Sequence, residues 1–364
     1  YSTAGDANTW KVGLTWDTPL PGVRLRALQS RDIRAPNLSE LFFPASGLNG
    51  SINNEFCTAQ GLPAATCNGQ QVRQLNVGNS LLKPEKSQTT EVGLVWQPDF
   101  IPGFQASIDY YRIAVKGPIV SLGLQTVEHL CFAGFTTFCA QDAITTSDGI
   151  NQSVAAPHIG GGITAVSSKV FNFGSIITDG FDLEAGYQFD LQDYNVPGSF
   201  VLRSLITHTS KFIVDSAIPG TQRNVEITGS LGGGGNSNQY NSNFNVLNWK
   251  LQETQSYQND VWGFNLTERW YSGGVTTARN TIVCAPGTCP ASTTQSPTID
   301  FNKVDSILYF DIGANWNVSD KTQLYAKVDN AANTRPPDTG GQNANNTLYD
   351  VIGRMYRVGV RFSN

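Results

Sequence analysis

The chain has 364 residues, with a net charge of −5 at neutral pH, 36 glycines, 10% aromatic residues and a single methionine. The acidic balance gives no basic footprint for nucleic acid, and no apolar run approaches the roughly 18 residues that a membrane helix needs. This composition is typical of a β-rich, turn-rich chain, so any membrane crossing would have to use strands. No linker-like stretch divides the sequence, and we expect one architectural unit over residues 1–364.

Segments in which apolar and polar residues alternate recur along the whole chain. In residues 303–316, Leu308 and Ile312 share an apolar face, whereas Tyr309 and Asp311 lie on the opposite face. Such alternation is the pattern of a strand with two different environments. The predicted strands are, in chain order, residues 9–16, 22–30, 86–96, 103–116, 177–190, 198–213, 243–256, 260–271, 303–316, 322–330 and 351–362.

The predicted strands are long, and many carry aromatic residues at their ends. They run to about 9–13 residues, whereas strands of soluble sheets commonly have about 5–6. A strand that crosses a membrane needs about 9–11 residues, and aromatic girdles mark both membrane interfaces. The pattern therefore favours a transmembrane β-barrel, with a soluble β-sandwich as the alternative.

Short and long connections alternate between the predicted strands. The short ones are residues 17–21, 97–103, 191–197, 257–260 and 317–321, and the long ones are residues 31–85, 117–175, 215–242, 272–302 and 331–350. Soluble domains rarely carry several loops of more than about 12–15 residues, but outer-membrane barrels have short periplasmic turns and long outer loops. Because single-chain bacterial barrels usually have an even number of strands, eleven strands predict a fragment whose missing strands precede Tyr1.

Several short motifs resemble those of TonB-dependent outer-membrane receptors. Residues 34–42 read R-A-P-N-L-S-E-L-F, similar to the family's R-A-P-x-x-x-E-L-F stretch. Residues 78–94 contain G-N-S-L-L-K-P-E-K-S followed by E-V-G-L, similar to its G-N-x-x-L-K-P-E-x-S…E-x-G stretch. The end of the chain, residues 349–362, resembles the closing strand of the family. The motifs occur in the family's order and span nearly the whole chain.

This resemblance implies an all-β fold, an antiparallel transmembrane barrel of 22 strands with an amino-terminal plug. The chain would be the carboxyl-terminal half of the barrel, without the plug and without the TonB box, the segment that touches TonB. The implied function is active import through the bacterial outer membrane of a scarce, bulky solute, such as a siderophore, cobalamin, an oligosaccharide or a peptide. The implied partners are the TonB complex, outer-membrane lipid, the barrel assembly machinery and that ligand. A passive pore or adhesin barrel without a plug is the alternative.

The six cysteines all lie in predicted long connections, as three close pairs. Neighbours within one loop should pair first because short loops close at the least entropic cost. Each disulfide would stabilise its loop by about 2–4 kcal/mol, and its formation requires an oxidising compartment such as the periplasm. A zinc site is the alternative, but no companion Cys-x₂-Cys or His pair accompanies the last pair. The predicted disulfides are Cys57–Cys67, Cys131–Cys139 and Cys284–Cys289.

Two groups of residues are candidates for a functional role. Four candidate ligand-binding residues lie where the second strand passes into the first long connection, with anchoring of that loop as their alternative role: Arg34, Asn37, Glu40 and Phe42. Four residues on the apolar face of the closing strand are predicted to be needed for assembly, because an open sheet edge cannot persist in lipid: Tyr356, Val358, Val360 and Phe362. We expect no enzyme and no cofactor, because the sequence has no G-x-S-x-G nucleophile elbow between a strand and a helix.

Overall fold

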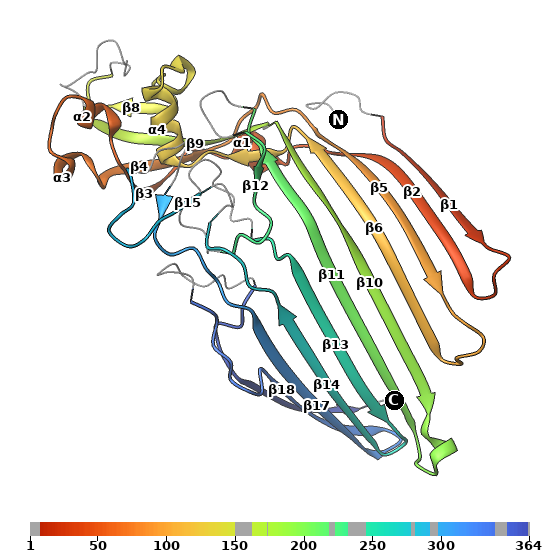
Figure 1. Cartoon of the computed structure of the whole chain (residues 1–364). Coiled ribbons are helices and arrows are strands. Elements are labelled where there is room, and N and C mark those ends of the chain that lie inside the picture. The colour runs from red at the N-terminus through yellow and green to blue at the C-terminus, as the bar shows by residue number, and fades with distance from the viewer. Residues whose placement is uncertain are drawn as a thin grey trace.

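The computed structural model describes residues 8–149, 162–172, 174–217, 223–231, 245–277, 281–291, 298–338 and 348–362. Its main feature is one antiparallel sheet in which the long strands pair in chain order (Figure 1). All eleven predicted strands are confirmed, although several of their ends are displaced. They are β1 (Trp10–Asp17), β2 (Val23–Arg34), β5 (Glu85–Trp96), β6 (Phe104–Lys116), β10 (Ser175–Asp190), β11 (Ser199–Asp215), β13 (Trp249–Gln258), β14 (Trp262–Tyr271), β17 (Ile307–Ser319), β18 (Thr322–Asp329) and β19 (Met355–Phe362).

Tight turns join the strands at one end of the sheet, which we call the short-turn end. Gly22, between β1 and β2, has a φ of 72°, and a Cβ there would collide with the carbonyl oxygen of Gln97 in the neighbouring turn. Gly103 has a φ of 84° and the same relation to the carbonyl of Gln188. Glycine adopts such a backbone without steric cost, so neighbouring turns can approach closely. The other end of the sheet is the long-loop end.

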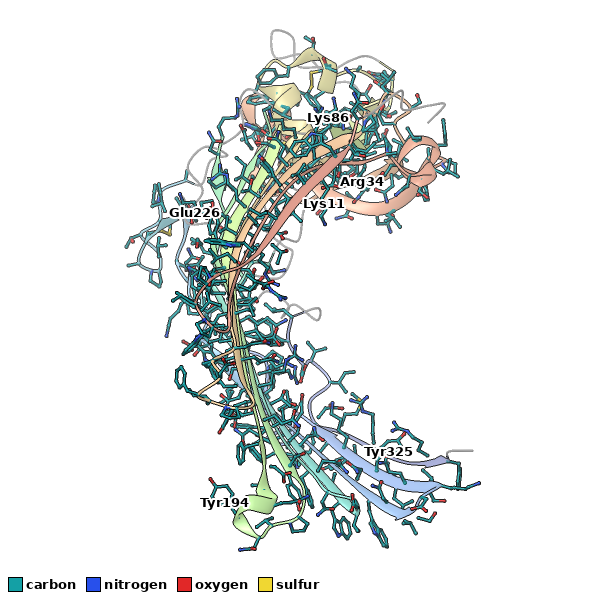
Figure 2. The ribbon with its side chains drawn as sticks, turned by 90° about the vertical axis from the view of Figure 1, so that its right-hand side faces the viewer. Lys11, Arg34, Lys86, Tyr194, Glu226 and Tyr325 are labelled. Atoms are coloured by element: carbon teal, nitrogen blue, oxygen red, sulfur yellow. A yellow bond between two sulfur atoms is a disulfide. The ribbon has the colours of Figure 1, made fainter. Side chains whose placement is uncertain are left out.

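The sheet curves like part of a cylinder wall and has two different sides (Figure 2). On one side Ile312 of β17 is 49% exposed, whereas Tyr309 and Asp311 on the other side are 0% and 6% exposed. Arg34, which lies on the same side as Asp311 in the register of the sheet, points to the concave side. The predicted assignment of strand faces is therefore confirmed. We call the convex side the apolar face and the concave side the polar face.

Two long connections fold into a unit that strand alternation did not predict. Residues 31–85 and 117–175 were expected to be loops, but they share a five-stranded sheet in which β4 pairs in parallel with β9. Its strands are β3 (Ser46–Ile52), β4 (Gln70–Val77), β7 (Ile119–Ser121), β8 (Ile144–Thr146) and β9 (Ile163–Asn172). Helices α2 (Glu55–Ala59), α3 (Ala64–Cys67), α4 (Leu124–Phe132) and the 3₁₀-helix η1 (Thr136–Phe138) accompany them. We call these nine elements the loop body.

The remaining elements are short. They are α1 (Leu38–Phe42), the 3₁₀-helix η2 (Leu191–Tyr194), β12 (Val225–Glu226), β15 (Ile282–Val283) and β16 (Thr298–Ile299). No helix in the described part of the chain is long and apolar enough to cross a membrane. The irregular and helical structure is concentrated at the long-loop end of the sheet (Figure 1).

A hydrophobic core holds the loop body together and joins it to the main sheet. Leu130 of α4 and Ile144 of β8 are fully buried within it, and Val214 of β11 belongs to the same cluster. Burial of such a side chain contributes about 1.5–3 kcal/mol relative to exposure. The loop body is therefore packed against a barrel strand rather than tethered only through its ends.

The three predicted disulfides are confirmed. The paired Cα atoms lie 5.5 Å apart in Cys57–Cys67, 4.8 Å apart in Cys131–Cys139 and 5.3 Å apart in Cys284–Cys289. The first joins α2 to α3 and the second joins α4 to the residue after η1. Two of the three disulfides therefore staple the loop body.

The first prediction concerns the edge strand β19. Val358 is 82% exposed on the apolar face, where alternation predicts lipid. Val358→Arg should lower the folded yield of the full-length protein, because a cation on a lipid-facing strand costs up to about 2–4 kcal/mol. Val358→Leu is the matched apolar control and should fold normally. Heat-modifiable gel mobility measures the folded fraction, and equal yields for the two variants would contradict the face assignment.

Candidate functional site

The polar face, with the loop body above its long-loop end, is the candidate functional site. Ion pairs lie along this face, between two strands in four cases and within β18 for Lys327–Asp329. Most are partly exposed, so each contributes little to stability. They are Arg24–Asp17, Arg26–Asp109, Arg203–Glu184, Lys327–Asp329 and Arg357–Asp329. The polar face therefore presents charged side chains, and it is suited to contact with water or with a polar partner.

Arg34 binds two carboxylates on the polar face, at the long-loop end of the sheet. Its Nη2 and Nε atoms donate to Glu85 at 2.6 and 2.8 Å, and its Nη1 atom lies 3.0 Å from both carboxylate oxygens of Glu40. The contacts with Glu85 are bidentate, the strong geometry for a guanidinium and a carboxylate. Arg34 thus ties β2, β5 and α1 together where the chain leaves the main sheet.

The other three candidate ligand-binding residues lie on or next to α1. Asn37 and Glu40 form a reciprocal capping box, with a 2.7 Å bond from the Glu40 amide to Asn37 and a 2.8 Å bond from the Asn37 amide to Glu40. A capping box satisfies amides that a helix start would leave without partners. Phe42 has no such bond and is 56% exposed. The structure therefore brings all four residues together, with Phe42 presenting the most open apolar surface.

One face of α4, in the connection of residues 117–175, forms hydrogen bonds with the start of α2, in the connection of residues 31–85. Gln125 accepts a 2.7 Å bond from the Asn53 amide and donates a 2.9 Å bond to the Asn53 carbonyl. Glu128 accepts a 2.7 Å bond from the amide of Glu55. His129 Nδ1 lies 2.9 Å from the Glu55 carboxylate. Because residues 125, 128 and 129 share one helical face, a single helix locks two connections that are distant in sequence.

Glu128 is the most strongly perturbed acid in this contact. Its side chain is fully buried. Burial first, and then the neighbouring Glu55 carboxylate, raise the pKa of Glu128 to about 8. The bonds from the α2 amides and from Gln125 act in the opposite direction but do not offset the cost of burying the charge.

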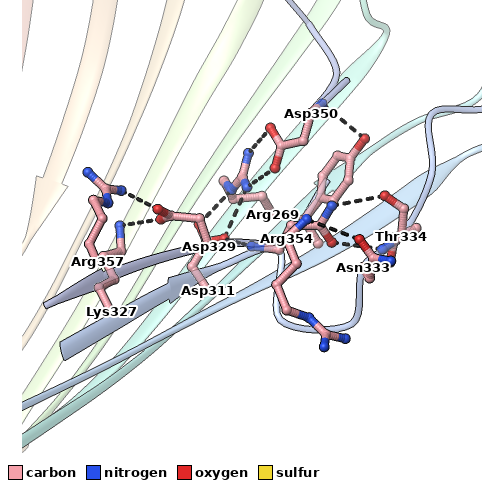
Figure 3. A network of polar contacts seen from close by, with 11 residues as sticks. Arg269, Asp311, Lys327, Asp329, Asn333, Thr334, Asp350, Arg354 and Arg357 are labelled. Carbon is pink, nitrogen blue, oxygen red and sulfur yellow. Dashed lines mark hydrogen bonds and ion pairs between the residues drawn. The ribbon is translucent and has the colours of Figure 1, made fainter. Parts of the chain in front are cut away.

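A second network fixes the last long connection to the polar face (Figure 3). Arg269 of β14 donates to Asp311 of β17 at 2.9 Å and to Asp350 at 2.7 Å. The guanidinium lies 5.0 Å from the centre of the Tyr309 ring, whose hydroxyl accepts a 3.2 Å bond from the Asp350 amide. Asp311 also accepts a 2.8 Å bond from the amide of Asn330, at the end of β18. Arg269 therefore holds the Asp350 end of the connection between β18 and β19 directly and the Asn330 end through Asp311.

A hollow lies near the short-turn end of the sheet, with a volume of about 590 Å³. Polar-face residues of β6, β10 and β11 line much of it, including Gln105, Gln188 and Arg203. Gly186 lies between Gln105 and Arg203 in the register of the sheet and leaves room between those side chains. The hollow offers amide and guanidinium groups to whatever occupies the concave side.

Sequence reasoning missed several residues that organise the site. Arg269 lies in a predicted strand and follows the same alternation as Thr267, so its face was readable, but its partner Asp350 lies in a long connection. The i, i+3 and i+7 spacing of Leu124, Val127 and Cys131 was a readable helical signal for this segment. What the polar side chains of this helix contact was not readable, because the other connection is more than 70 residues away.

The second prediction concerns pH. The folded loop body keeps the Glu128 proton up to about pH 8, whereas the unfolded segment releases it near the ordinary value of 4.5. Loop-body stability should therefore fall as the pH rises between these values, by at most about 1.4 kcal/mol per pH unit. Glu128→Gln, which mimics the neutral acid, should remove this dependence in hydrogen exchange of α4. Asp142→Asn, at an exposed acid of the same body, should retain it, and an unchanged pH profile in Glu128→Gln would contradict the prediction.

The third prediction compares two arginines of the polar face. Arg269→Met leaves the Asp311 carboxylate, whose side chain is 8% exposed, without its cation. Loss of one partner from a buried ion pair costs about 3–5 kcal/mol. Arg203→Met breaks a pair whose side chains are 55% and 38% exposed and should cost less than about 1 kcal/mol. Urea unfolding of the full-length protein measures both, and similar losses would contradict the role of burial.

Comparison with known proteins identifies the architecture. A family model described as TonB dependent receptor-like, beta-barrel, matches residues 1–331. No curated protein matches the sequence significantly. Among solved structures, the siderophore receptor PirA from Acinetobacter baumannii has 16% identity and a TM-score of 0.57, and a mutant ferric enterobactin receptor PfeA from Pseudomonas aeruginosa has 18% identity and a TM-score of 0.59. The copper transporter OprC has 17% identity and a TM-score of 0.51.

The share of each chain that is covered and the sequence identity determine what these matches show. They cover 97–99% of this chain but only 39–41% of the matched chains, so the chain spans about two fifths of the length of its structural relatives. Identities this low show the shared fold, and the family match covers most of the chain. The chain therefore belongs to the β-barrel family of TonB-dependent receptors, which are proteins of the bacterial outer membrane.

Proposed function

We propose that this chain is the carboxyl-terminal half of a plugged outer-membrane barrel that imports a scarce, bulky solute with energy delivered through TonB. The observation that carries the proposal is the family match over residues 1–331, together with a sheet of eleven long strands whose polar face is concave. A concave polar wall suits a folded, polar domain inside the barrel. The hollow near the short-turn end, lined by Gln105 and Arg203, gives that domain a place to form hydrogen bonds.

The loop body supports capture of the solute at the outer end of the barrel. Two disulfides, a shared core and the α4 contact with α2 hold it in one conformation. A preformed surface binds a solute without the entropic cost of ordering a loop. We propose that Arg34, Asn37, Glu40 and Phe42 line the approach to this surface, with Phe42 in contact with the solute and the three polar residues holding it in place.

We propose a metal-chelating molecule as the first solute to test. Two of the similar structures are siderophore receptors and a third is a copper transporter. Cobalamin, oligosaccharides and peptides are the other solute classes. A passive pore or adhesin barrel is the second candidate function, and it differs in one measurable respect: it needs no TonB.

The fourth prediction is uptake that depends on TonB. The full-length protein, expressed in cells without siderophore receptors of their own, should import radiolabelled ferric siderophore only when TonB is present. Equal uptake with and without TonB would establish a passive pore. Binding of cells or surfaces without uptake of any of the four solute classes would establish an adhesin.

The same cells test the role of Phe42. Phe42→Ala should weaken solute binding about fivefold or more, since truncation of a contact aromatic residue commonly costs more than about 1 kcal/mol. Phe100→Ala, at an aromatic residue that is 76% exposed in a short turn, is the matched control and should bind normally. Unchanged binding in Phe42→Ala would leave import intact but remove Phe42 from the binding surface.

A further inference from the structure

A cluster of basic residues lies on the apolar face, toward its long-loop end. Arg31 of β2, Lys86 of β5 and Lys116 of β6 lie on the opposite side of their strands from Arg34 and Glu85, whose contact marks the polar face. Lys86 is labelled near the upper end of the sheet in Figure 2. This cluster is separate from the ion pairs of the polar face and from the candidate solute-binding residues.

The register of the sheet brings these cations close together. Lys86 pairs directly with Lys116, so their Cβ atoms lie about 4.5–5.5 Å apart. Arg31 pairs with Gln88, so it lies diagonally from Lys86, at about 7–8 Å. Like charges placed directly opposite each other destabilise a sheet. An anion bound between these side chains would offset the repulsion.

The described residues around the cluster do not supply that anion. Two acids lie nearby on the same face, but each is engaged by another arginine. Asp179 lies 3.7 Å from Arg112, and Asp215 accepts a 2.8 Å bond from Arg223. Arg31, Lys86 and Lys116 form no ion pair with any described residue. The chain therefore concentrates three uncompensated cations on one small surface, although its net charge is −5.

The position of the cluster indicates where the anion comes from. Below it, toward the short-turn end, the same face carries exposed apolar and aromatic side chains such as Val92 and Tyr110. In an outer-membrane barrel this band contacts hydrocarbon, and aromatic residues mark the interface. Lys86 and Lys116 lie six residues beyond Val92 and Tyr110 along their strands, a distance of about 20 Å. The cations are therefore on the outer side of this band, toward the lipid headgroups of the outer leaflet.

We propose that Arg31, Lys86 and Lys116 bind the phosphate groups of a glycolipid in the outer leaflet. Lysine supplies compact positive charge, and arginine supplies a planar set of donors that matches phosphate oxygens. Gln88, between Arg31 and Ala114 in the register of the sheet, adds an uncharged hydrogen-bonding group. The bound lipid offsets the repulsion between Lys86 and Lys116 and fixes the depth of this part of the barrel in the membrane.

The test measures binding of lipid A, a glycolipid with two phosphates, to the purified full-length receptor in detergent by native mass spectrometry. The double variant Lys86→Gln/Lys116→Gln should bind lipid A about 10- to 30-fold more weakly, given about 1 kcal/mol per basic residue near an anionic membrane surface. The variant Lys11→Gln/Lys250→Gln removes two lysines that the register places on the polar face and should bind normally. Lys86→Arg/Lys116→Arg, which keeps both charges, should also bind normally.

Three outcomes would overturn the proposal. The first is equal loss of lipid A binding in the two glutamine double variants, when heat-modifiable mobility shows that both are folded. The second is equally tight binding of lipid A from which both phosphates have been removed, because contact would then be apolar only. The third is competition by inorganic phosphate at concentrations near those of lipid A, which would assign the cluster to a soluble anion instead of a lipid. Each outcome is independent of solute import.

Discussion

The structure depends on one constraint: within a membrane, every backbone amide and carbonyl must find its partner in the protein. The nine inner long strands meet it by pairing on both sides with their neighbours, whereas β1 and β19 are paired on one side in this chain. Irregular structure is excluded from those segments and is concentrated at the long-loop end, where water satisfies the backbone. The same sequence therefore contains a regular sheet and an irregular long-loop end. Only the long-loop end accommodates the loop body with its four short helices.

This division explains how much of the fold was predictable. Alternation over Val304 to Trp316 identifies both faces of a strand because the membrane and the concave side impose different chemistry on alternate residues. The strands of the loop body are short, and β4 pairs in parallel with β9 across about 90 residues of sequence. No local period encodes such a pairing. The disulfides were predictable because loop closure is local, whereas the parallel pairing depends on a core that forms only when both connections meet.

In the candidate site, too, contacts between residues near in sequence were predictable and contacts between distant residues were not. The four residues Arg34, Asn37, Glu40 and Phe42 fall within one nine-residue segment, and the structure keeps them together. Arg269 and Asp350 are separated by 81 residues, and only the folded sheet brings them within hydrogen-bonding distance. Their burial, not the number of ion pairs on the polar face, decides which contacts matter. An exposed pair exchanges its bonds with water at little cost, whereas a buried carboxylate without its cation does not.

The rigidity of the outer surface constrains how such a receptor can act. A body stapled by two disulfides and packed onto β11 through Val214 cannot reshape extensively around a solute. Under the proposed import function, selectivity would come from a preformed surface and large movement would occur elsewhere. The connection between β18 and β19 is held differently, through the polar contacts of Arg269 with Asp311 and Asp350 and a few buried rings. Polar contacts can be exchanged for contacts with a charged solute or partner, whereas a disulfide cannot. Of these two parts only the loop body contains disulfides, so the connection between β18 and β19 is the one that a charged solute or partner could displace without breaking a covalent bond.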